Sequence, residues 1–125
     1  MLAHALGIAA EDTSDAVAAT RLVASAYHPH THADGADAAL RTLLELLPDE
    51  AHEAVAARVQ LLVQACEATA GLVRGDDLPV PVTRRIAPDG STVLVALTGR
   101  PFGAGSRRCP GEAHARALVE GVLDR

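Results

Sequence analysis

Residues 49–74 carry the longest helical pattern in the chain, and they read DEAHEAVAARVQLLVQACEATAGLVR. Asp49 is a plausible N-cap and Gly75 a plausible stop, so one long helix is predicted between them. At 1.5 Å per residue it would span on the order of 35–40 Å, the width of a small domain, and we expect it to be the central helix of the fold. The apolar residues that share one face of this helix are Val55, Val59, Leu62, Val63, Cys66, Ala70 and Val73.

The N-terminal side of this helix predicts further helices. Residues 2–6 form a short apolar helical end, and Thr13 or Ser14 can cap a helix that continues to about Tyr27. Another helix is predicted over residues 36–47, because leucines recur there at i, i+3, i+4 and i+7. The apolar residues of these two longer helices are Val17, Leu22, Val23 and Ala26 in the first, and Leu40, Leu43, Leu44 and Leu47 in the second.

A loop rich in Pro, Gly and polar residues is predicted at 28–35, between those two helices. Its His28, His30 and His32 alternate, so an extended backbone would turn all three imidazoles to one side, which suits Zn²⁺ or Cu²⁺. No acid or cysteine lies at a diagnostic spacing from them. A role as general acid or base is the alternative for any of these histidines, since histidine titrates near neutral pH.

After residue 78 the chain changes from a helical to a β-branched pattern. Two runs, residues 80–86 and 93–98, flank a Pro-Asp-Gly turn at 88–90 and predict a β-hairpin. Pro79 and Pro81 would keep its first strand short or at an edge. The sequence therefore changes its periodicity once, from helix to strand.

A Gly- and Arg-rich loop at 99–110 and a final helix at 111–123 complete the predicted elements. The apolar residues of that helix are Ala115, Leu118, Val119 and Val122. The predicted fold class is mainly α: a compact helical domain built on one long central helix, with a small β-hairpin and a cysteine loop before the C-terminal helix. We expect a single domain over residues 1–125, with an acidic helical part at 1–78 and the remaining elements at 79–125.

The composition excludes several function classes. The 125 residues carry a net charge of −5, which argues against a nucleic-acid binder that relies on a general basic surface. No apolar run reaches the ~18–20 residues of a membrane span, and no basic leader opens the chain, so a cytoplasmic protein is expected. Two cysteines are more plausible as thiols than as a disulfide framework.

The charge is unevenly distributed along the chain. Residues 1–78 hold four Arg and twelve acidic residues, whereas residues 79–125 hold seven Arg and four acidic residues. The two parts could dock on each other through this asymmetry, or the basic part could hold an anionic ligand. Arg84 and Arg85 are open to the same two interpretations, a solvated strand edge or a clamp on an anionic group.

The segment with the clearest chemistry is residues 102–111, which read FGAGSRRCPG. Cys109 ends a Gly-rich loop immediately before a helix, so the positive end of the helix dipole would lie close to its sulfur. Arg107 and Arg108 add positive charge, and both effects favour the thiolate that binds metal ions. The glycines allow backbone conformations and close approaches that a Cβ would block.

This segment resembles the haem-binding signature of the cytochrome P-450 family, Phe-Gly-x-Gly-x-Arg-x-Cys-x-Gly, at every fixed position. The resemblance implies that Cys109 is the thiolate ligand of the iron of haem b, that Arg107 contacts a haem propionate, and that Phe102 packs near the sulfur. Thiolate ligation donates electron density to the iron and favours O–O cleavage. The remaining haem-binding positions implied by the signature are Gly103, Gly105 and Gly111.

Two other segments resemble the same family less specifically. Residues 61–71 resemble its long distal helix, and this similarity implies that Glu67 and Thr69 carry the acid and the threonine used for dioxygen protonation. Residues 79–87 resemble a strand of the family's sheet. The family's Glu-x-x-Arg and Trp-x-x-x-Arg elements have no match, and its members are much longer. The chain therefore resembles a strongly truncated relative.

The resemblance implies a small haem-thiolate protein that performs oxidative, peroxide- or oxygen-dependent chemistry on a small secondary metabolite. A homo-oligomer could supply a wall that so short a chain lacks, and neither a nucleic acid nor a membrane is an expected partner. Two alternatives stay open: a haem-free remnant acting as a cofactor-independent cyclase or isomerase, and a non-catalytic partner protein. Cys66 is expected to be a buried small hydrophobic residue, and His114 a surface residue.

Overall fold

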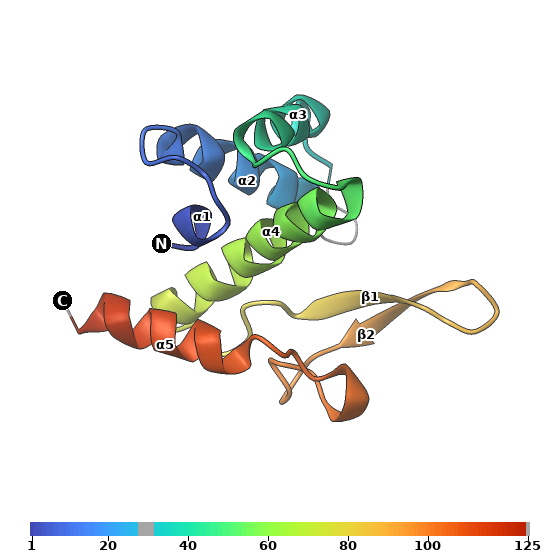
Figure 1. The fold of residues 1–125 in the computed structure, drawn as a ribbon. Helices are drawn as coiled ribbons and strands as arrows, with labels where there is room; N and C mark the ends of the chain where they lie inside the picture. The colour runs from blue at the N-terminus through green and yellow to red at the C-terminus, as the bar shows by residue number, and fades with distance from the viewer. Residues whose placement is uncertain (28–31, 125) are drawn as a thin grey trace. The chain divides into compact units, whose positions relative to one another are not determined.

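The computed structural model describes residues 1–27 and 32–124. Over these residues the chain is mainly helical, with one two-stranded antiparallel sheet, which confirms the predicted mainly α class with a β-hairpin (Figure 1). The residues divide into two compact units, Met1–Cys66 and Glu67–Arg125. That the chain forms a single domain stays a prediction.

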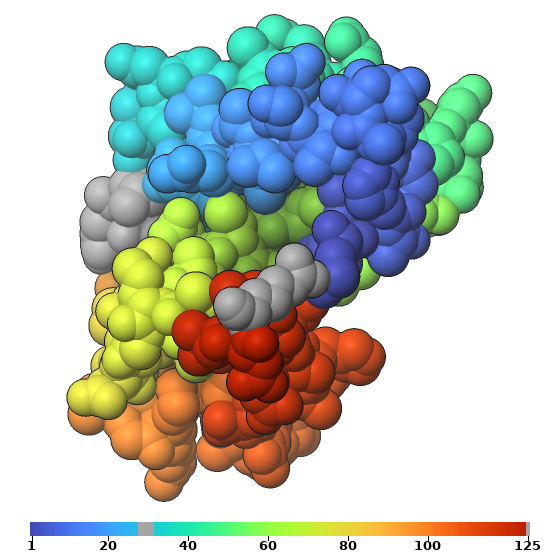
Figure 2. All heavy atoms as spheres, turned by 90° about the vertical axis from the view of Figure 1, so that its left-hand side faces the viewer, coloured from blue at the N-terminus to red at the C-terminus, as the bar shows by residue number. Residues whose placement is uncertain are grey.

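The first unit is built on two packed helices. α2 (Thr13–Tyr27) and α3 (Ala36–Leu46) lie side by side, preceded by the single-turn α1 (Leu2–Ala5). In the space-filling view their blue and cyan atoms form one continuous surface (Figure 2). The buried residues of the core cluster are Ile8, Ala16, Ala19, Ala39, Leu43, Leu47 and Leu62. This cluster is rich in alanine, which permits close approach of the helix backbones.

The buried face of α2 differs from the predicted one. Ala16, Ala19, Thr20 and Ala24 are buried, whereas Val17 is 50% exposed and Leu22 is 37% exposed. The i, i+3, i+4 and i+8 spacing is helical, but the face is made of small side chains rather than of the larger apolar residues. Small residues at the contact allow α2 to approach its neighbours closely, and Val17 and Leu22 lie outside this contact.

The long helix α4 (His52–Arg74) forms as predicted but begins three residues later than expected. Asp49 is therefore not its N-cap. Instead, Glu50 turns back to the first turns of the helix, where its carboxylate accepts hydrogen bonds from Arg58 at 2.8 to 3.3 Å. Arg58 also donates to the Leu6 carbonyl oxygen at 2.7 Å, so one guanidinium ties α4 to the chain after α1. Gly75, with φ +79°, ends the helix as predicted.

The hairpin consists of β1 (Val82–Ile86) and β2 (Thr92–Ala96), paired antiparallel from Val82 with Ala96 to Ile86 with Thr92. Its first strand begins directly after Pro81, in agreement with the short strand predicted there. The Gly90 N–H donates to the Ala87 carbonyl oxygen, and Gly90 has a φ of +82°, which is typical of a type I turn followed by a bulge.

The Asp89 side chain completes this turn. Its Oδ1 accepts hydrogen bonds from the Ser91 backbone N–H at 2.9 Å and the Ser91 hydroxyl at 2.7 Å. These bonds favour the carboxylate and hold the pKa of Asp89 below its usual value of 3.8. The turn that the sequence predicted is thus fixed by a local side-chain cap.

Gly7 provides a direct test of packing in the first unit. Its φ is +92°, and a Cβ added there would lie 2.6 Å from Pro48 Cγ. Gly7→Ala is therefore expected to destabilise the protein by about 1–3 kcal/mol, from strain and overpacking together. The measurement is the midpoint of urea unfolding.

The matched control is Gly121→Ala, in the last helix, where an added Cβ meets no atom within 4 Å among the described residues. This variant is expected to stabilise the protein by about 0.5–1 kcal/mol, because alanine favours helix. Equal urea midpoints for the two variants would show that Pro48 can shift to make room for the added Cβ without a loss of stability.

No helix among residues 1–27 and 32–124 combines the length and the apolar character needed to cross a bilayer.

Candidate functional site

The cysteine loop is closed by its own backbone hydrogen bonds. The Cys109 N–H donates to the Phe102 carbonyl oxygen at 2.8 Å, and the Gly103 N–H donates to the Arg100 carbonyl oxygen at 2.8 Å. Between them lies the short 3₁₀ turn η1 (Gly105–Arg107). The segment is therefore a compact loop whose two ends, at 102 and 109, are bonded to each other.

Two of the three glycines of the signature have the conformational role that the sequence predicted. Gly103 has a φ of +74°, and a Cβ there would lie 3.1 Å from the Arg107 carbonyl oxygen. Gly105 also has a positive φ, of +59°. Gly111 has a φ of −88°, and a Cβ there would sit 3.8 Å from Cys109 Sγ, an ordinary contact. Gly111 therefore has no conformation that requires glycine, and the close approach that the sequence also predicted for it stays a prediction.

Cys109 is exposed, and neither it nor Cys66 is in a disulfide. The residue stands just before α5 (Glu112–Leu123), whose N-cap residue, Gly111, provides no side-chain cap. The first N–H groups of α5 thus lack a side-chain acceptor at the end of the helix where the dipole is positive. The expected placement of a thiol beside a helix N-terminus is found. Cys66 is half-buried on α4.

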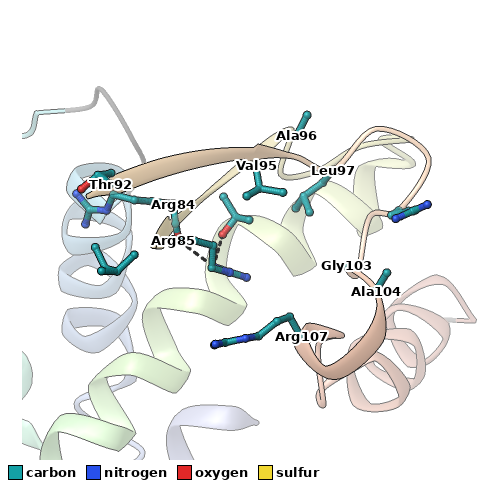
Figure 3. Close-up of a pocket in the computed structure, with 12 residues that line it drawn as sticks. Arg84, Arg85, Thr92, Val95, Ala96, Leu97, Gly103, Ala104 and Arg107 are labelled. Carbon is teal, nitrogen blue, oxygen red and sulfur yellow. Dashed lines mark hydrogen bonds between the residues drawn. The ribbon is translucent and has the colours of Figure 1, made fainter. Parts of the chain in front are cut away.

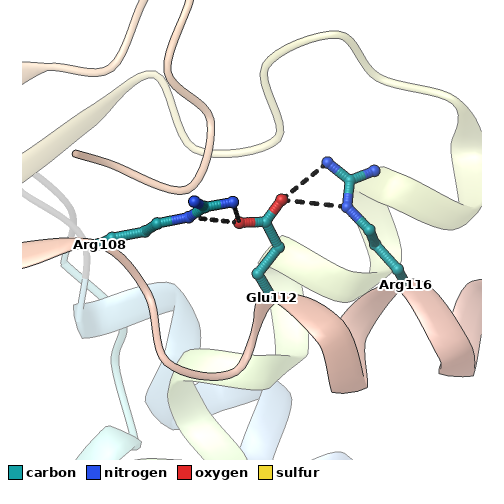
Figure 4. A network of polar contacts seen from close by, with 3 residues as sticks. All are labelled: Arg108, Glu112 and Arg116. Carbon is teal, nitrogen blue, oxygen red and sulfur yellow. Dashed lines mark hydrogen bonds and ion pairs between the residues drawn. The ribbon is translucent and has the colours of Figure 1, made fainter. Parts of the chain in front are cut away.

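The loop is also held by a set of side chains that we call the loop clasp: Phe102, Arg108, Glu112 and Arg116. Each carboxylate oxygen of Glu112 accepts two hydrogen bonds from one guanidinium, Oε2 from Arg108 at 2.6 and 2.8 Å and Oε1 from Arg116 at 3.0 and 3.1 Å (Figure 4). The Arg116 guanidinium also lies 4.9 Å from the centre of the Phe102 ring. The loop clasp connects both ends of the loop to α5.

The loop clasp changes the charge assigned to the loop. The sequence predicted that Arg107 and Arg108 both add positive charge at the thiol. Arg108 instead shares the single carboxylate of Glu112 with Arg116, whereas Arg107 forms no ion pair among the described residues. The two guanidinium groups hold the pKa of Glu112 below its usual value of 4.5, the Arg108 hydrogen bonds contributing most.

Glu112→Gln is expected to lower the melting temperature at neutral pH by a few degrees, because it removes the charge that both arginines share. A carboxyl whose pKa is depressed by folding stabilises the folded state above its unfolded pKa, and this contribution is lost as pH falls through the lower, folded pKa. The difference between wild type and variant should therefore be full above about pH 4.5 and vanish in stronger acid.

The control for this experiment is Glu120→Gln, on the same helix, whose side chain forms no ion pair among the described residues. It should leave the melting temperature unchanged at each pH. A pH-independent difference for Glu112→Gln would mean that packing, and not charge, holds the loop clasp together.

A cavity of about 860 Å³ opens between the hairpin and the cysteine loop, within the second unit (Figure 3). Figure 3 shows the side chains of Arg85 and Arg107 extending into the space between these segments. The lining residues are Thr83, Arg84, Arg85, Ile86, Thr92, Val95, Ala96, Leu97, Arg100, Gly103, Ala104 and Arg107. The cavity thus combines four arginines with aliphatic side chains and has no acidic residue in its lining.

The structure places the other candidate residues apart from this cavity. Cys109, Glu67 and Thr69 are absent from its lining. Glu67 and Thr69 both lie on α4, two residues apart, so they point about 200° away from each other around the helix. The two residues that the resemblance assigns to proton transfer therefore lie on different sides of α4.

The histidine hypothesis is tested only in part. His28 and His30 lie outside the described residues. His32 is exposed, and its Nε2 lies 3.0 Å from Asp34 Oδ1. Among the residues that the structure describes, no group of three or more His, Cys, Asp or Glu could hold a metal ion. His114 is exposed, as expected.

Some residues of the site were not singled out from the sequence. Arg100 lines the cavity, and Glu112 and Arg116 form the loop clasp. The i, i+4 spacing of Arg108, Glu112 and Arg116 is a signal that could have identified these ion pairs. No comparable signal marks Arg100, which reaches the cavity through the fold of the loop. Comparison of the chain with protein-family models, with curated protein sequences and with solved structures found no match.

Proposed function

We propose that residues 67–125 bind haem b as a thiolate complex, in the manner of the cytochrome P-450 family that the signature resembles. The observation that carries the proposal is the exposed Cys109 thiol at the end of a loop whose two ends are hydrogen-bonded to each other. The six fixed residue types of the signature all lie in or directly after that loop. Backbone bonds and the loop clasp hold it against α5, so the thiol is presented from a fixed position.

The donor set fits this group by its chemistry. A thiolate-ligated haem needs a cysteine thiolate for its iron, and cationic side chains stabilise its two propionates. Cys109 supplies the thiol, and Arg107 supplies a guanidinium without a carboxylate partner among the described residues. When bound, a thiolate-ligated haem supplies one-electron and oxygen chemistry. Cys109 would hold the iron, and Arg107 would orient the cofactor through one propionate.

The residues of this chain would contribute positioning and proton transfer. The loop clasp bonds Arg108 to Glu112, and Phe102 is half-buried beside the guanidinium of Arg116. Of the two candidates on α4, either Glu67 or Thr69 would hold a proton near the substrate, since they lie on different sides of the helix. The proposed activity is peroxide- or oxygen-dependent oxidation of a small metabolite.

The test is an absorption spectrum of the purified protein after addition of hemin, and again after reduction and exposure to carbon monoxide. A strongly red-shifted Soret band is the expected result, since it is the signature of thiolate ligation. Failure to take up hemin would overturn the proposal.

One observation favours a second candidate, a haem-free protein acting as a cofactor-independent cyclase or isomerase or as a binding partner. Cys109 does not line the cavity that the chain forms, so ligand binding in that cavity need not involve the thiol. A colourless protein that stays colourless with hemin, yet gains thermal stability from a small ligand, would support this candidate. The cytoplasmic setting and a homo-oligomer remain predictions under either function.

A further inference from the structure

Four arginines line one cavity, and two of them are consecutive residues of β1, so their side chains leave the strand on opposite faces. Arg84, Arg85, Arg100 and Arg107 line it, and the hydrogen bonds of Arg85 go to the Thr83 hydroxyl at 2.6 Å and the Arg84 carbonyl oxygen at 2.9 Å, both uncharged. Among the described residues the four form no ion pair, whereas Arg108 and Arg116 of the same unit do. Like charges gathered in this way repel each other, and a bound anion would offset the repulsion.

Most of the remaining lining residues are aliphatic, and Thr83 and Thr92 add two hydroxyl groups. Ile86, Val95 and Leu97 contribute its larger apolar side chains, and Ala96 and Ala104 the smaller ones. No aromatic residue lines the cavity, so it offers no surface on which a nucleobase or another flat ring would stack. A ligand that matches both parts of the lining has an anionic head and an aliphatic body.

Size and charge narrow the ligand class further. A volume of about 860 Å³ is that of a small-molecule site. Guanidinium groups bind phosphate oxygens in bidentate geometry, and a phosphate monoester carries about −1.5 to −2 charges at pH 7, more than a single carboxylate. We propose that this arginine cavity is a binding site for a phosphate monoester of an aliphatic alcohol, which does not involve the Cys109 thiol although Gly103, Ala104 and Arg107 of the cysteine loop line it.

The proposal is tested by titrating the purified protein, without added hemin, with octyl phosphate in a calorimeter. Binding that weakens with added salt is expected, because the head group is held by charge. Inorganic phosphate and octanol are the probes for the separate parts of the ligand, and each should bind at least tenfold more weakly than octyl phosphate. Equal affinity for inorganic phosphate and octyl phosphate would overturn the aliphatic part of the proposal.

The site variant is the double substitution Arg85→Ala and Arg100→Ala, which removes two of the four charges and leaves Arg107 in place. It should weaken octyl phosphate binding at least tenfold. The matched control is Arg21→Ala with Arg41→Ala, two exposed arginines of the first unit, which changes the net charge equally. An equal loss of affinity in both double variants would mean that the loss comes from the change in net charge alone. That result would overturn the proposal. Circular dichroism establishes that each variant is folded.

The test also separates this site from the proposed haem site. Cys109→Ser should leave the affinity for octyl phosphate unchanged, since the thiol does not line the cavity. Hemin that displaces octyl phosphate would show that the arginines belong to a haem site, and the proposal of a separate site would then fail. Binding of octyl phosphate by a protein that takes up no hemin would refute the haem proposal and leave this one standing.

Discussion

Cys109→Ser is expected to abolish the strongly red-shifted Soret band of the reduced, carbon monoxide-treated protein. Serine keeps the size of the side chain but replaces a soft thiolate by a hydroxyl, which is a poor ligand for haem iron. Because Cys109 is exposed, the substitution leaves no cavity in the core, and folding should be unaffected. Absorption spectra at equal hemin concentrations measure the effect.

Cys66→Ser is the control, since Cys66 lies half-buried on α4 and the signature assigns it no ligand role. Its spectrum should match that of the wild type. A Cys109→Ser protein that takes up hemin and keeps the wild-type band would show that another residue holds the iron.

Leu43→Ala is expected to cause the largest loss of stability of any single truncation in the first unit. Leu43 is 0% exposed and lies in the core cluster formed by α2, α3 and their neighbours. Truncating a buried leucine costs about 2–5 kcal/mol, from lost burial and the cavity left behind. A small domain has only about 5–15 kcal/mol in total, so this substitution should remove a substantial part of its stability.

The neighbouring residue provides the control. Leu44 is 47% exposed on the same helix, so Leu44→Ala changes the same number of atoms outside the core and should cost well under half as much. Urea unfolding followed by circular dichroism measures both variants. Similar costs for the two would mean that the face of α3 buried in solution differs from the one described.

The fold could be predicted where the local sequence determines the structure. The proline and glycine signals located the hairpin, and the leucine spacing located α3, because these depend on the residues themselves. The buried face of α2 could not be predicted, since alanines fill the interface and only packing against another helix selects them. The start of α4 was missed because Glu50, which pairs with Arg58, extends the non-helical segment past Asp49.

For the candidate site, too, only the features that depend on local sequence could be predicted. The positive φ angles of Gly103 and Gly105 follow from a contiguous motif, so the sequence predicted them, whereas the hydrogen bond that closes the loop was not predicted. The arginine cavity depends on how the hairpin and the loop fold toward each other, and no spacing rule places Arg100 beside Arg84. The arginine cavity could therefore not be predicted, because its lining residues come from segments that are distant in sequence.

Each strand of a two-stranded sheet has a free edge that can pair with a strand of another molecule. In this hairpin the two edges differ in how readily they would do so. β2 reads Thr-Val-Leu-Val-Ala over Thr92–Ala96, with no charge and no proline, and all five residues are exposed. Such a segment can add strands from other copies and start a cross-β stack. β1 carries Arg84 and Arg85, directly across from Leu94 and Val93, and charges of this kind act as gatekeepers against stacking. Shielding these two arginines with concentrated salt would therefore promote aggregation of the purified protein through β2.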